Sequence, residues 1–176
     1  MRVLAGDIGG TKTLLALAQI EGSRVHILQE KLFSSAPYPD FTSLAREFLL
    51  AAPAEAAPAC FGVPGPVVAG RAPVTKLPWV LEETRLESEL GLGRVRLIND
   101  FAAIARGIEA LAPNDLAVLN PGSADPVGSM AVLGAGTGLG EALVVKAGGH
   151  PQVISGEGGT PTSPPATSWK STSCAG

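Results

Sequence analysis

The chain has 176 residues, a formal net charge of −3 and 45% hydrophobic residues. This composition supplies enough apolar side chains for a buried core, and the weak acidic balance gives no electrostatic reason to expect nucleic acid as a partner. No apolar run is long enough to span a bilayer, and the first residues lack the pattern of a secretion signal, so no membrane partner is expected. Cys60 and Cys174 show no metal-ligand spacing, and a reduced, cytoplasmic environment is therefore the expectation.

In chain order, a three-stranded start is predicted first, followed by alternating helices and strands. Asp40 is a plausible N-cap for the first helix, and Gly91 is expected to end the second. This order favours an α/β domain that ends near residue 112. The predicted strands are 2–7, 12–19, 24–34, 59–63 and 95–98, and the predicted helices start after Asp40 and cover 82–90 and 101–111.

A glycine-rich stretch near the start lies between two apolar runs that both suit extended chain. The pattern predicts a tight hairpin whose N–H groups surround a small concavity, which attracts phosphate oxygens. Glycine suits such a turn because it tolerates positive φ and lets a ligand come close. Asp7 could hold a hydrated Mg²⁺ beside those phosphates, although an ordinary hairpin turn with an exposed aspartate also fits this stretch alone. The candidate phosphate-binding residues are Gly6, Asp7, Ile8, Gly9, Gly10 and Thr11.

A similar pattern of strand, glycine-rich turn and strand recurs at residues 130–145. Such an echo suggests two similar domains, and two phosphate-binding turns facing each other across a cleft would clamp a nucleotide. A Walker A loop is excluded because the sixth position from Gly6 is Thr11, and a dinucleotide fingerprint is excluded because Leu139 stands where a third glycine is needed. The candidate residues of the second turn are Gly134, Gly136, Thr137 and Gly138.

Asn99 and Asp100 follow a predicted strand and precede a predicted helix. Ligands gather at the carboxyl ends of strands in α/β sheets, so the pair is a candidate site. Asp100 could act as a general base that takes a proton from a substrate hydroxyl oriented by Asn99. The alternative is that Asp100 only caps the helix. With two phosphate turns and a metal-associated Asp7, the set favours phosphoryl transfer.

Residues 6–17, 99–103 and 134–140 resemble the phosphate-1, catalytic and phosphate-2 segments of bacterial glucokinases. That family belongs to the actin/hexokinase/Hsp70 nucleotidyl-clamp superfamily, and the resemblance extends from residue 2 to about residue 159. It implies a ribonuclease H-like or actin-like lobe over residues 1–112, built as a mixed sheet flanked by helices. The opening strands of a second, similar lobe would occupy residues 113–159.

The resemblance implies that ATP, with Mg²⁺, phosphorylates the 6-hydroxyl of glucose, the first step of glycolysis. In this match Asp100 is the base, Asn99 and Glu157 hold sugar hydroxyls, and the two glycine turns hold ATP. Glu157 taken alone would be read as a solvated loop carboxylate. Lys76 stands where the family usually shows Asn, which leaves nearby sugar contacts open. Full-length members of the family are expected to be homodimers. The related ROK kinases usually carry a cysteine-rich zinc motif, which the two distant cysteines of this chain cannot form.

After Gly159 the chain departs from the family pattern, which continues with a sugar-contacting His and an Asp-Phe-Ala-Pro segment. Eleven of the seventeen residues 160–176 are Ser, Thr or Pro, a composition typical of a disordered tail. A sharper hypothesis is a frameshift, since restoring one base after Gly159 lets GC-rich codons read His-Ala-Asp-Phe-Ala-Pro. Resequencing across the junction tests it, and an unbroken frame would remove it.

Because two lobes must close on ATP, a chain that lacks most of the second lobe is expected to be impaired or inactive. The alternatives are an active ATP:glucose phosphotransferase and a non-catalytic sugar- or nucleotide-binding fragment. An actin- or chaperone-like ATPase would fit the clamp but not the segment Gly156–Gly159 beside Asn99 and Asp100.

Overall fold

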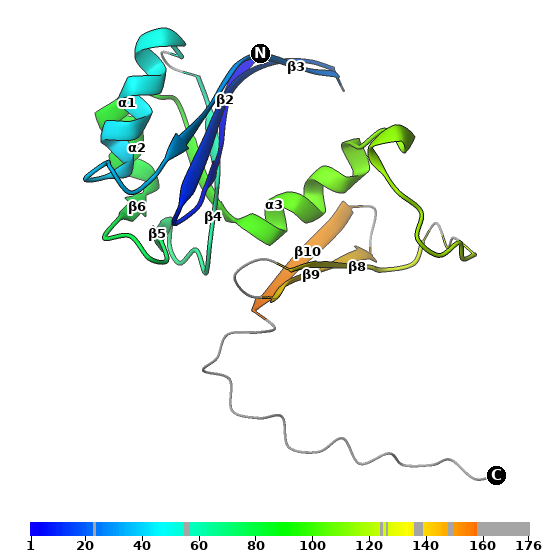
Figure 1. Cartoon of the computed structure of the whole chain (residues 1–176). Coiled ribbons are helices and arrows are strands. Elements are labelled where there is room, and N and C mark those ends of the chain that lie inside the picture. Colours follow the sequence, from blue (N-terminus) through cyan, green and yellow to red (C-terminus); the bar gives the residue numbers. More distant parts are fainter. Residues whose placement is uncertain are drawn as a thin grey trace, which may run out of the picture.

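The computed structural model describes residues 1–22, 24–54, 57–123, 125, 127–135, 139–147 and 150–157 (Figure 1). Its largest sheet has five strands in the order β3-β2-β1-β4-β7. The β1–β2 and β2–β3 pairs are antiparallel, whereas β1–β4 and β4–β7 are parallel, so the predicted mixed sheet is confirmed. Its strands are β1 (Arg2–Ile8), β2 (Lys12–Glu21), β3 (Arg24–Ser34), β4 (Ala59–Val63) and β7 (Val95–Asn99).

Two smaller sheets accompany the five-stranded one. A hairpin of β5 (Arg71–Pro73) and β6 (Val80–Glu82) leads into the second helix. The other is an antiparallel sheet in the order β10-β9-β8. Its strands are β8 (Met130–Ala135), β9 (Leu139–Ala147) and β10 (His150–Glu157). The hairpin and β10 were not among the strands predicted from the sequence.

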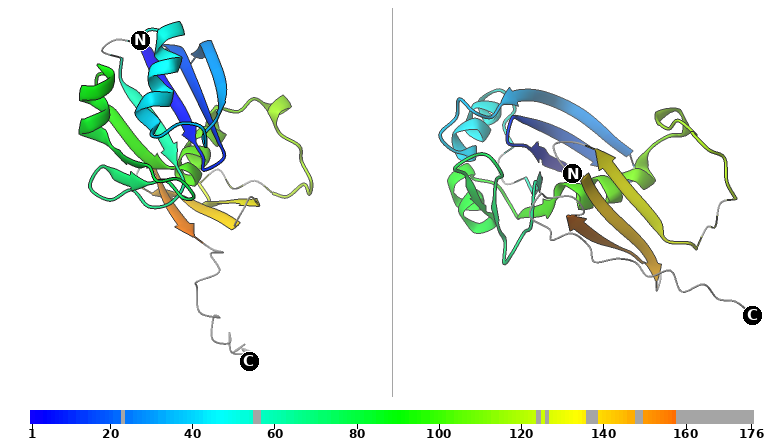
Figure 2. Two further views of the ribbon diagram at one scale, coloured as in Figure 1. Left: turned by 60° about the vertical axis from the view of Figure 1, so that its left-hand side comes forward. Right: turned by 60° about the horizontal axis from the view of Figure 1, so that its bottom comes forward.

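Helices lie on both faces of the five-stranded sheet. Figures 1 and 2 show α1 (Phe41–Ala51) and α2 (Glu83–Leu90) on one face and α3 (Asp100–Gly107) on the other. Helix α3 contacts β4 and β7 on one side and β9 and β10 on the other, so it lies between the two larger sheets. It continues into the 3₁₀ turn η1 (Ile108–Ala110), so the α-helix is shorter than the one predicted to reach residue 111. A separate 3₁₀ turn, η2 (Pro113–Asp115), follows after the extended residues Leu111 and Ala112.

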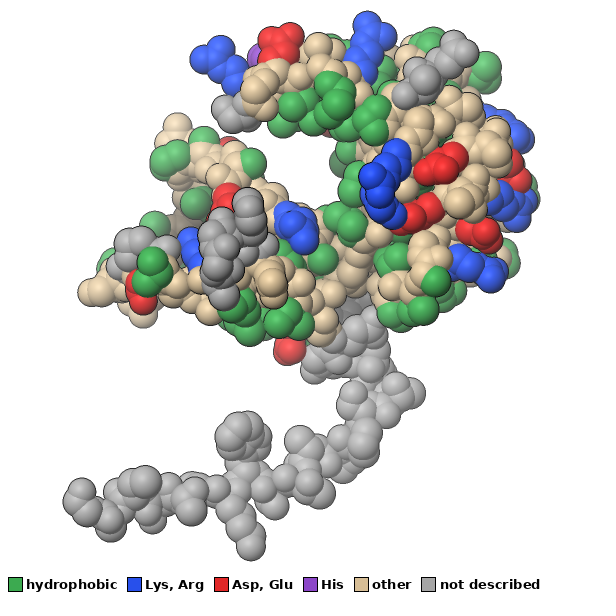
Figure 3. Space-filling model, turned by 180° about the vertical axis from the view of Figure 1, so that it is seen from behind, with side chains coloured by type: hydrophobic (Ala, Val, Ile, Leu, Met, Phe, Trp, Pro, Cys, Tyr) green, Lys and Arg blue, Asp and Glu red, His purple; other side chains and the backbone are tan. Residues whose placement is uncertain are grey.

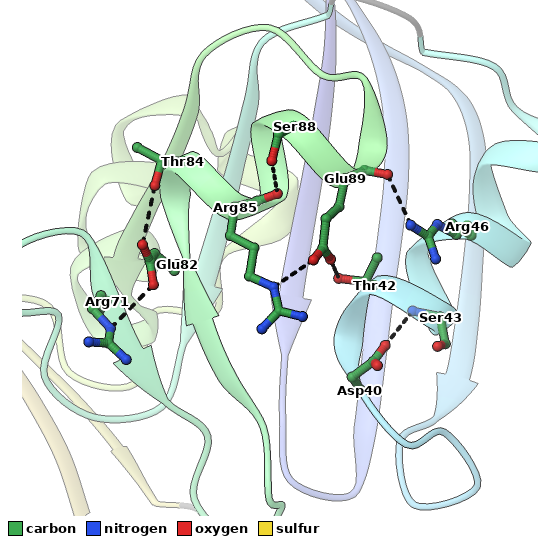
Figure 4. A network of polar contacts seen from close by, with 10 residues as sticks. All are labelled: Asp40, Thr42, Ser43, Arg46, Arg71, Glu82, Thr84, Arg85, Ser88 and Glu89. Atoms are coloured by element: carbon green, nitrogen blue, oxygen red, sulfur yellow. Dashed lines mark hydrogen bonds and ion pairs between the residues drawn. The ribbon is translucent and has the colours of Figure 1, made fainter.

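The first two helices are capped and linked to each other. Asp40 caps α1 as predicted, because its carboxylate accepts a hydrogen bond from the Ser43 N–H at 2.7 Å. The Glu89 carboxylate of α2 accepts from Thr42 of α1 at 2.9 Å and from Arg85 at 2.6 Å (Figure 4). Gly91 ends α2 in the left-handed region at φ 62°, a conformation that glycine adopts without steric cost. The Thr42–Glu89 hydrogen bond thereby links the start of α1 to the end of α2.

The buried apolar residues form two clusters of unequal size. The larger one fills the space between the five-stranded sheet and helices α1 and α2, around Leu4, Phe48 and Phe61. The smaller one lies between α3 and the three-stranded sheet and consists of Ala105, Val132, Ala142 and Val144. Apolar side chains on β3 stay exposed, and Figure 3 shows hydrophobic side chains bordering a hollow in the molecular surface. Those on β3 are Val25, Ile27, Leu28 and Leu32. The described helices include none long and apolar enough to cross a membrane.

Candidate active site

The first glycine turn joins β1 to β2 as a tight hairpin, as predicted. The strands pair up to Ile8 and Thr13, and the Gly9 N–H donates to the Lys12 carbonyl at 2.9 Å. The Ser35 hydroxyl donates to the Gly9 carbonyl at 2.8 Å and lies 2.9 Å from the Thr13 hydroxyl. Thr13 and Ser35 are fully buried, so these hydrogen bonds satisfy polar groups that water cannot reach. The turn is therefore held from beneath by a pair of buried hydroxyl groups.

Gly9 and Gly10 are explained by neighbouring backbone atoms that leave no room for a side chain, and not by positive φ. Neither Gly9 nor Gly10 lies in the left-handed region, so of the two reasons for glycine in such a turn, positive φ does not apply here. A Cβ on Gly9 would lie 2.8 Å from the Lys12 carbonyl oxygen, and one on Gly10 would overlap the Thr75 carbonyl oxygen. Glycine is required here because neighbouring backbone occupies the space. The loop that contacts Gly10 includes Lys76, which takes the unusual φ of 70°.

Gly6 and Ile8 lie within β1, and their side-chain positions face the core. Ile8 is fully buried, and a Cβ on Gly6 would lie 2.7 Å from Leu15 Cδ2 and 2.9 Å from Phe61 Cδ1. Only the backbone of these two residues could face a ligand. Thr11 is exposed at the tip of the hairpin, and its carbonyl accepts from the Ser35 N–H at 2.9 Å. Among the predicted phosphate-binding residues, Gly6 and Ile8 therefore face the core, whereas Thr11 is exposed at the tip of the hairpin.

Asp7 and Asp100 lie near each other although they are far apart in the sequence. Asp7 pairs with Gly62 across the β1–β4 ladder, and a Cβ on Gly62 would lie 3.7 Å from the Asp100 Cα. Asp7 is exposed by surface area, yet surrounding atoms displace part of the water from its carboxyl group. This desolvation is the larger cause that raises the Asp7 pKa above 3.8, and repulsion from Asp100 is the smaller. Two neighbouring carboxylates favour a cation between them.

Asn99, rather than Asp100, caps helix α3. The Asn99 Oδ1 accepts from the Ala102 N–H at 3.1 Å, and its Nδ2 donates to the Gly65 carbonyl at 3.2 Å. Asp100 is the first helical residue, and its Oδ1 accepts from the Phe101 N–H at 2.8 Å. The interpretation of Asp100 as the cap is therefore wrong by one residue. Capping leaves Asn99 one N–H and one oxygen lone pair for another partner.

The second glycine turn connects β8 to β9. Gly134 pairs with Gly140, and the Phe101 ring of α3 lies against both. Gly136, Thr137 and Gly138 fall outside the described residues. Glu157 ends β10, where its backbone pairs with Gly140, and its side chain also falls outside the description. The backbone of Gly134 and Glu157 thus lies at one end of the three-stranded sheet, beside the start of α3.

The carboxylates of the site suit a magnesium ion that is bound partly by substrate phosphates better than one that is bound by protein ligands alone. Within the described ranges there is no group of three or more His, Cys, Asp or Glu side chains that could hold a metal ion. Mg²⁺ in phosphoryl-transfer sites keeps several waters and binds one or two carboxylates together with substrate phosphates. Asp7, which lies beside Asp100, can supply such a carboxylate.

Three contributors to the site were not foreseen from the sequence. Ser35 supports Gly9, Thr75 packs against Gly10, and Phe101 packs against Gly134 and Gly140. Ser35 and Thr75 come from loops whose position depends on tertiary contacts, and no local pattern marks them. Phe101 lies in the segment 99–103 that resembles the catalytic segment, but its contact with the second glycine turn is a tertiary contact that the sequence does not indicate. The tail, residues 160–176, lies outside the described residues.

A family profile described as Glucokinase matches residues 4–173. The glucokinase of Nostoc sp. (strain PCC 7120) is 43% identical over 160 residues, which cover 89% of this chain and 47% of the relative. That of Synechocystis sp. (strain PCC 6803) is 44% identical over 167 residues, covering 88% and 47%. The chain spans about half the length of the curated relatives it matches.

Solved structures agree with this result. A glucokinase from an Antarctic psychrotroph superimposes with a TM-score of 0.79 at 31% identity, covering 89% of this chain and 50% of that one. A Balamuthia mandrillaris glucokinase in complex with glucose matches at 25% identity and a TM-score of 0.64, covering 89% and 47%. The predicted actin-like ATPase fold is confirmed. From its profile match, its curated relatives and its fold, this chain belongs to the glucokinase family.

Proposed function

We propose that the chain carries the residues that bind and phosphorylate the sugar in an ATP:D-glucose 6-phosphotransferase. The observation that supports this most is the position of Asp100 beside Asp7, at the start of α3. The next residue of that helix, Phe101, contacts Gly134 and Gly140 at the base of the second glycine turn. A carboxylate at the carboxyl end of β7 is where α/β sheets place ligand-binding groups. Membership of the glucokinase family supports the proposed reaction, in which glucose and ATP yield glucose 6-phosphate and ADP.

In the proposed reaction, Asp100 accepts the proton of the sugar 6-hydroxyl while that oxygen forms its bond to the γ-phosphorus of ATP and the bond to ADP breaks. The Oδ1 of Asp100 is held by the Phe101 N–H, which leaves Oδ2 to receive the proton. Asn99 orients the sugar with the N–H and lone pair that capping does not use, and Glu157 holds a second hydroxyl. Asp7 would hold a hydrated Mg²⁺, and the chemistry supplied by that ion would be neutralisation of phosphate charge.

The two glycine turns take the phosphates of ATP in this proposal. The first turn uses the backbone of Gly9, Gly10 and Thr11, and the second uses Gly136, Thr137 and Gly138. We also propose two units: residues 1–112 form one lobe, and residues 113–159 begin another. The division is supported by the larger buried cluster, whose members all lie within residues 1–112. The working environment is proposed to be cytoplasmic, and the longer relatives are proposed to act as homodimers.

A second candidate is a non-catalytic chain that binds glucose or nucleotide without turnover. The observation in its favour is that the chain spans about half the length of its relatives. Because closing two lobes on ATP excludes water from the reacting groups, a partial second lobe would bind substrates but leave them exposed.

A coupled assay for glucose 6-phosphate with the purified chain, ATP, Mg²⁺ and glucose separates these candidates. The phosphotransferase predicts turnover that Asp100→Asn lowers by roughly 10²–10⁴-fold, the usual contribution of a general base. Asp115→Asn is the matched control, since Asp115 is exposed in η2, and it should keep the parental rate. No turnover, combined with saturable binding of glucose or ATP, would favour the non-catalytic chain. ATP hydrolysis that does not depend on sugar would favour an actin-like ATPase instead.

A further inference from the structure

The Phe101 ring occupies a niche that exists only because two opposed residues lack side chains. Gly134 of β8 and Gly140 of β9 are direct partners in the antiparallel ladder. A Cβ built on Gly134 would lie 2.6 Å from Phe101 Cζ and 2.8 Å from Cε1. One built on Gly140 would overlap Cε2 of the same ring. Real Cβ atoms do not approach that closely, so an alanine at either position would have to displace the ring or the strand.

The side chains that face α3 become smaller toward the second turn. On β9 the sequence runs from Val144 through Ala142 to Gly140, and on β8 it runs from Val132 to Gly134. Val132, Ala142 and Val144 are buried in the smaller cluster, against which Phe101 packs. The space left by the shrinking side chains is filled by the one large residue at the start of α3. The two glycines therefore have a packing role that is separate from any contact with phosphate.

The same residue is joined to the proposed base through its backbone. The Phe101 N–H donates to Asp100 Oδ1 at 2.8 Å, and Asp100 Cα lies close to Gly62 on β4. Asp100 is thereby fixed against the five-stranded sheet, while the ring of its neighbour is fixed against the three-stranded sheet. A shift of the second turn would have to move the ring, and with it the first turn of α3.

We propose that Phe101 is a positioning residue that sets Gly134 and Gly140, the two residues at the base of the second glycine turn, relative to Asp100. This proposal rests on the proposed function for its consequence, since the turn would hold the phosphates of ATP and Asp100 would address the sugar. The packing part of the proposal does not depend on catalytic activity. It states that Gly134 and Gly140 must lack side chains for the Phe101 ring to fit, and that the ring in turn holds these two residues in place.

A double-mutant cycle on the full chain tests the packing part. Gly140→Ala should lower the melting temperature by at least about 3 °C in the parent and change it little in a Phe101→Ala background, because the ring that the new Cβ meets is gone. Gly156→Ala on β10 is the control, since no atom of the described residues lies within 4 Å of a Cβ there, and it should have the same effect in both backgrounds. Equal losses from Gly140→Ala in both backgrounds would overturn the proposal.

If Phe101→Ala fails to fold, Phe101→Leu replaces it and NMR supplies the readout. A ring stacked on Gly140 should shift its α-proton resonances upfield, and Phe101→Leu should return them toward ordinary values. If the Gly140 α-proton resonances of the parent are not shifted, the proposed packing of the Phe101 ring on Gly140 is wrong.

Nucleotide affinity gives a readout that a purely structural role would not move. Measured with a fluorescent ATP analogue well below the melting temperature, Phe101→Leu should weaken binding by roughly 5-fold or more, the usual lower range of coupling between sites. Ile104→Ala, at an exposed position on the same helix, should leave it unchanged. Unchanged affinity in Phe101→Leu would overturn the positioning role. A parent that binds no nucleotide would count against the proposed function, and the cycle and the NMR shifts would then decide the role of Phe101.

Discussion

The first glycine turn is held by main-chain and buried hydroxyl groups, whereas the base of the second is filled by one aromatic ring from α3. Ser35 and Thr13 lie beneath the first turn with no exposure to solvent, and the Thr75 carbonyl packs against its Gly10. At the second turn, Gly134 and Gly140 receive Phe101. Two stretches that look alike in sequence are therefore supported by different physical means.

The difference follows from what surrounds each turn. The first belongs to a five-stranded sheet with a large apolar cluster, so loops from elsewhere in the lobe can fix it. The second belongs to a three-stranded sheet whose cluster contains four buried residues among those that the structure describes. Within that described part, the ring from the neighbouring helix packs against the base of the turn. The first turn should thus be insensitive to changes in α3, and the second should depend on them.

Gly10→Ala should give the largest effect on the first turn. The added Cβ would overlap the Thr75 carbonyl oxygen, which belongs to backbone and cannot rotate away. Overpacking of this kind costs about 1–3 kcal/mol, and we expect the upper end. Chemical denaturation measures it. Gly107→Ala is the control because no atom lies near its Cβ, and in a helix it should be neutral or stabilising. Equal behaviour of the two variants would break the account of the first turn.

Ser35→Ala should come next. It removes the hydrogen bond to the Gly9 carbonyl and leaves the buried Thr13 hydroxyl without its partner. The expected loss of unfolding free energy is about 1–3 kcal/mol. Hydrogen exchange should show faster opening of amides 9–13, while amides of β8 and β9 keep their rates. Faster exchange spread over the three-stranded sheet would mean that the two turns share their support.

Asp7→Asn should make the chain more stable at neutral pH. The folded-state pKa of Asp7 is raised, by burial first and by Asp100 second, so the folded chain binds its proton more tightly than the unfolded chain does. Stability from this group is present below 3.8 and is lost as the pH rises through the raised value. The variant should lack that fall in a series of melts from pH 3 to pH 7. A parent and variant with parallel profiles would contradict the raised pKa of Asp7.

Lys76→Asn should give the smallest effect and a gain in stability. Lys76 holds φ at 70°, a conformation that asparagine tolerates better than lysine. The expected gain is up to about 1 kcal/mol, seen as a higher midpoint in urea. A lower midpoint would mean that the lysine side chain contributes to the packing of this loop on the first turn.

Much of the fold could be predicted because the signals are local. The period-2 and helical patterns gave β3 its observed bounds, Arg24–Ser34, and placed Asp40 as the cap of α1. The short β5–β6 hairpin and β10 carried no comparable pattern, since glycines and prolines interrupt them. The cap of α3 was placed one residue late because Asn99 and Asp100 are both good caps, and only the backbone decides between them.

The candidate site was predictable in its residue types but not in its supports. Glycine-rich turns and an Asn-Asp pair can be read from sequence, whereas the reason for each glycine depends on which distant atom occupies the missing Cβ position. Thr75 for Gly10 and Phe101 for Gly140 are tertiary contacts. The proximity of Asp7 to Asp100 likewise depends on the parallel pairing of β1, β4 and β7.

The most direct test of the central claim, that two glycine turns hold one nucleotide on either side of Asp100, is an NMR titration of the labelled chain with Mg²⁺ and ATP. The account predicts that amides 9–11 and 136–138 shift together along one binding curve, with amides at the start of α3 shifting as well. Shifts confined to one turn, or two curves with different affinities, would contradict it.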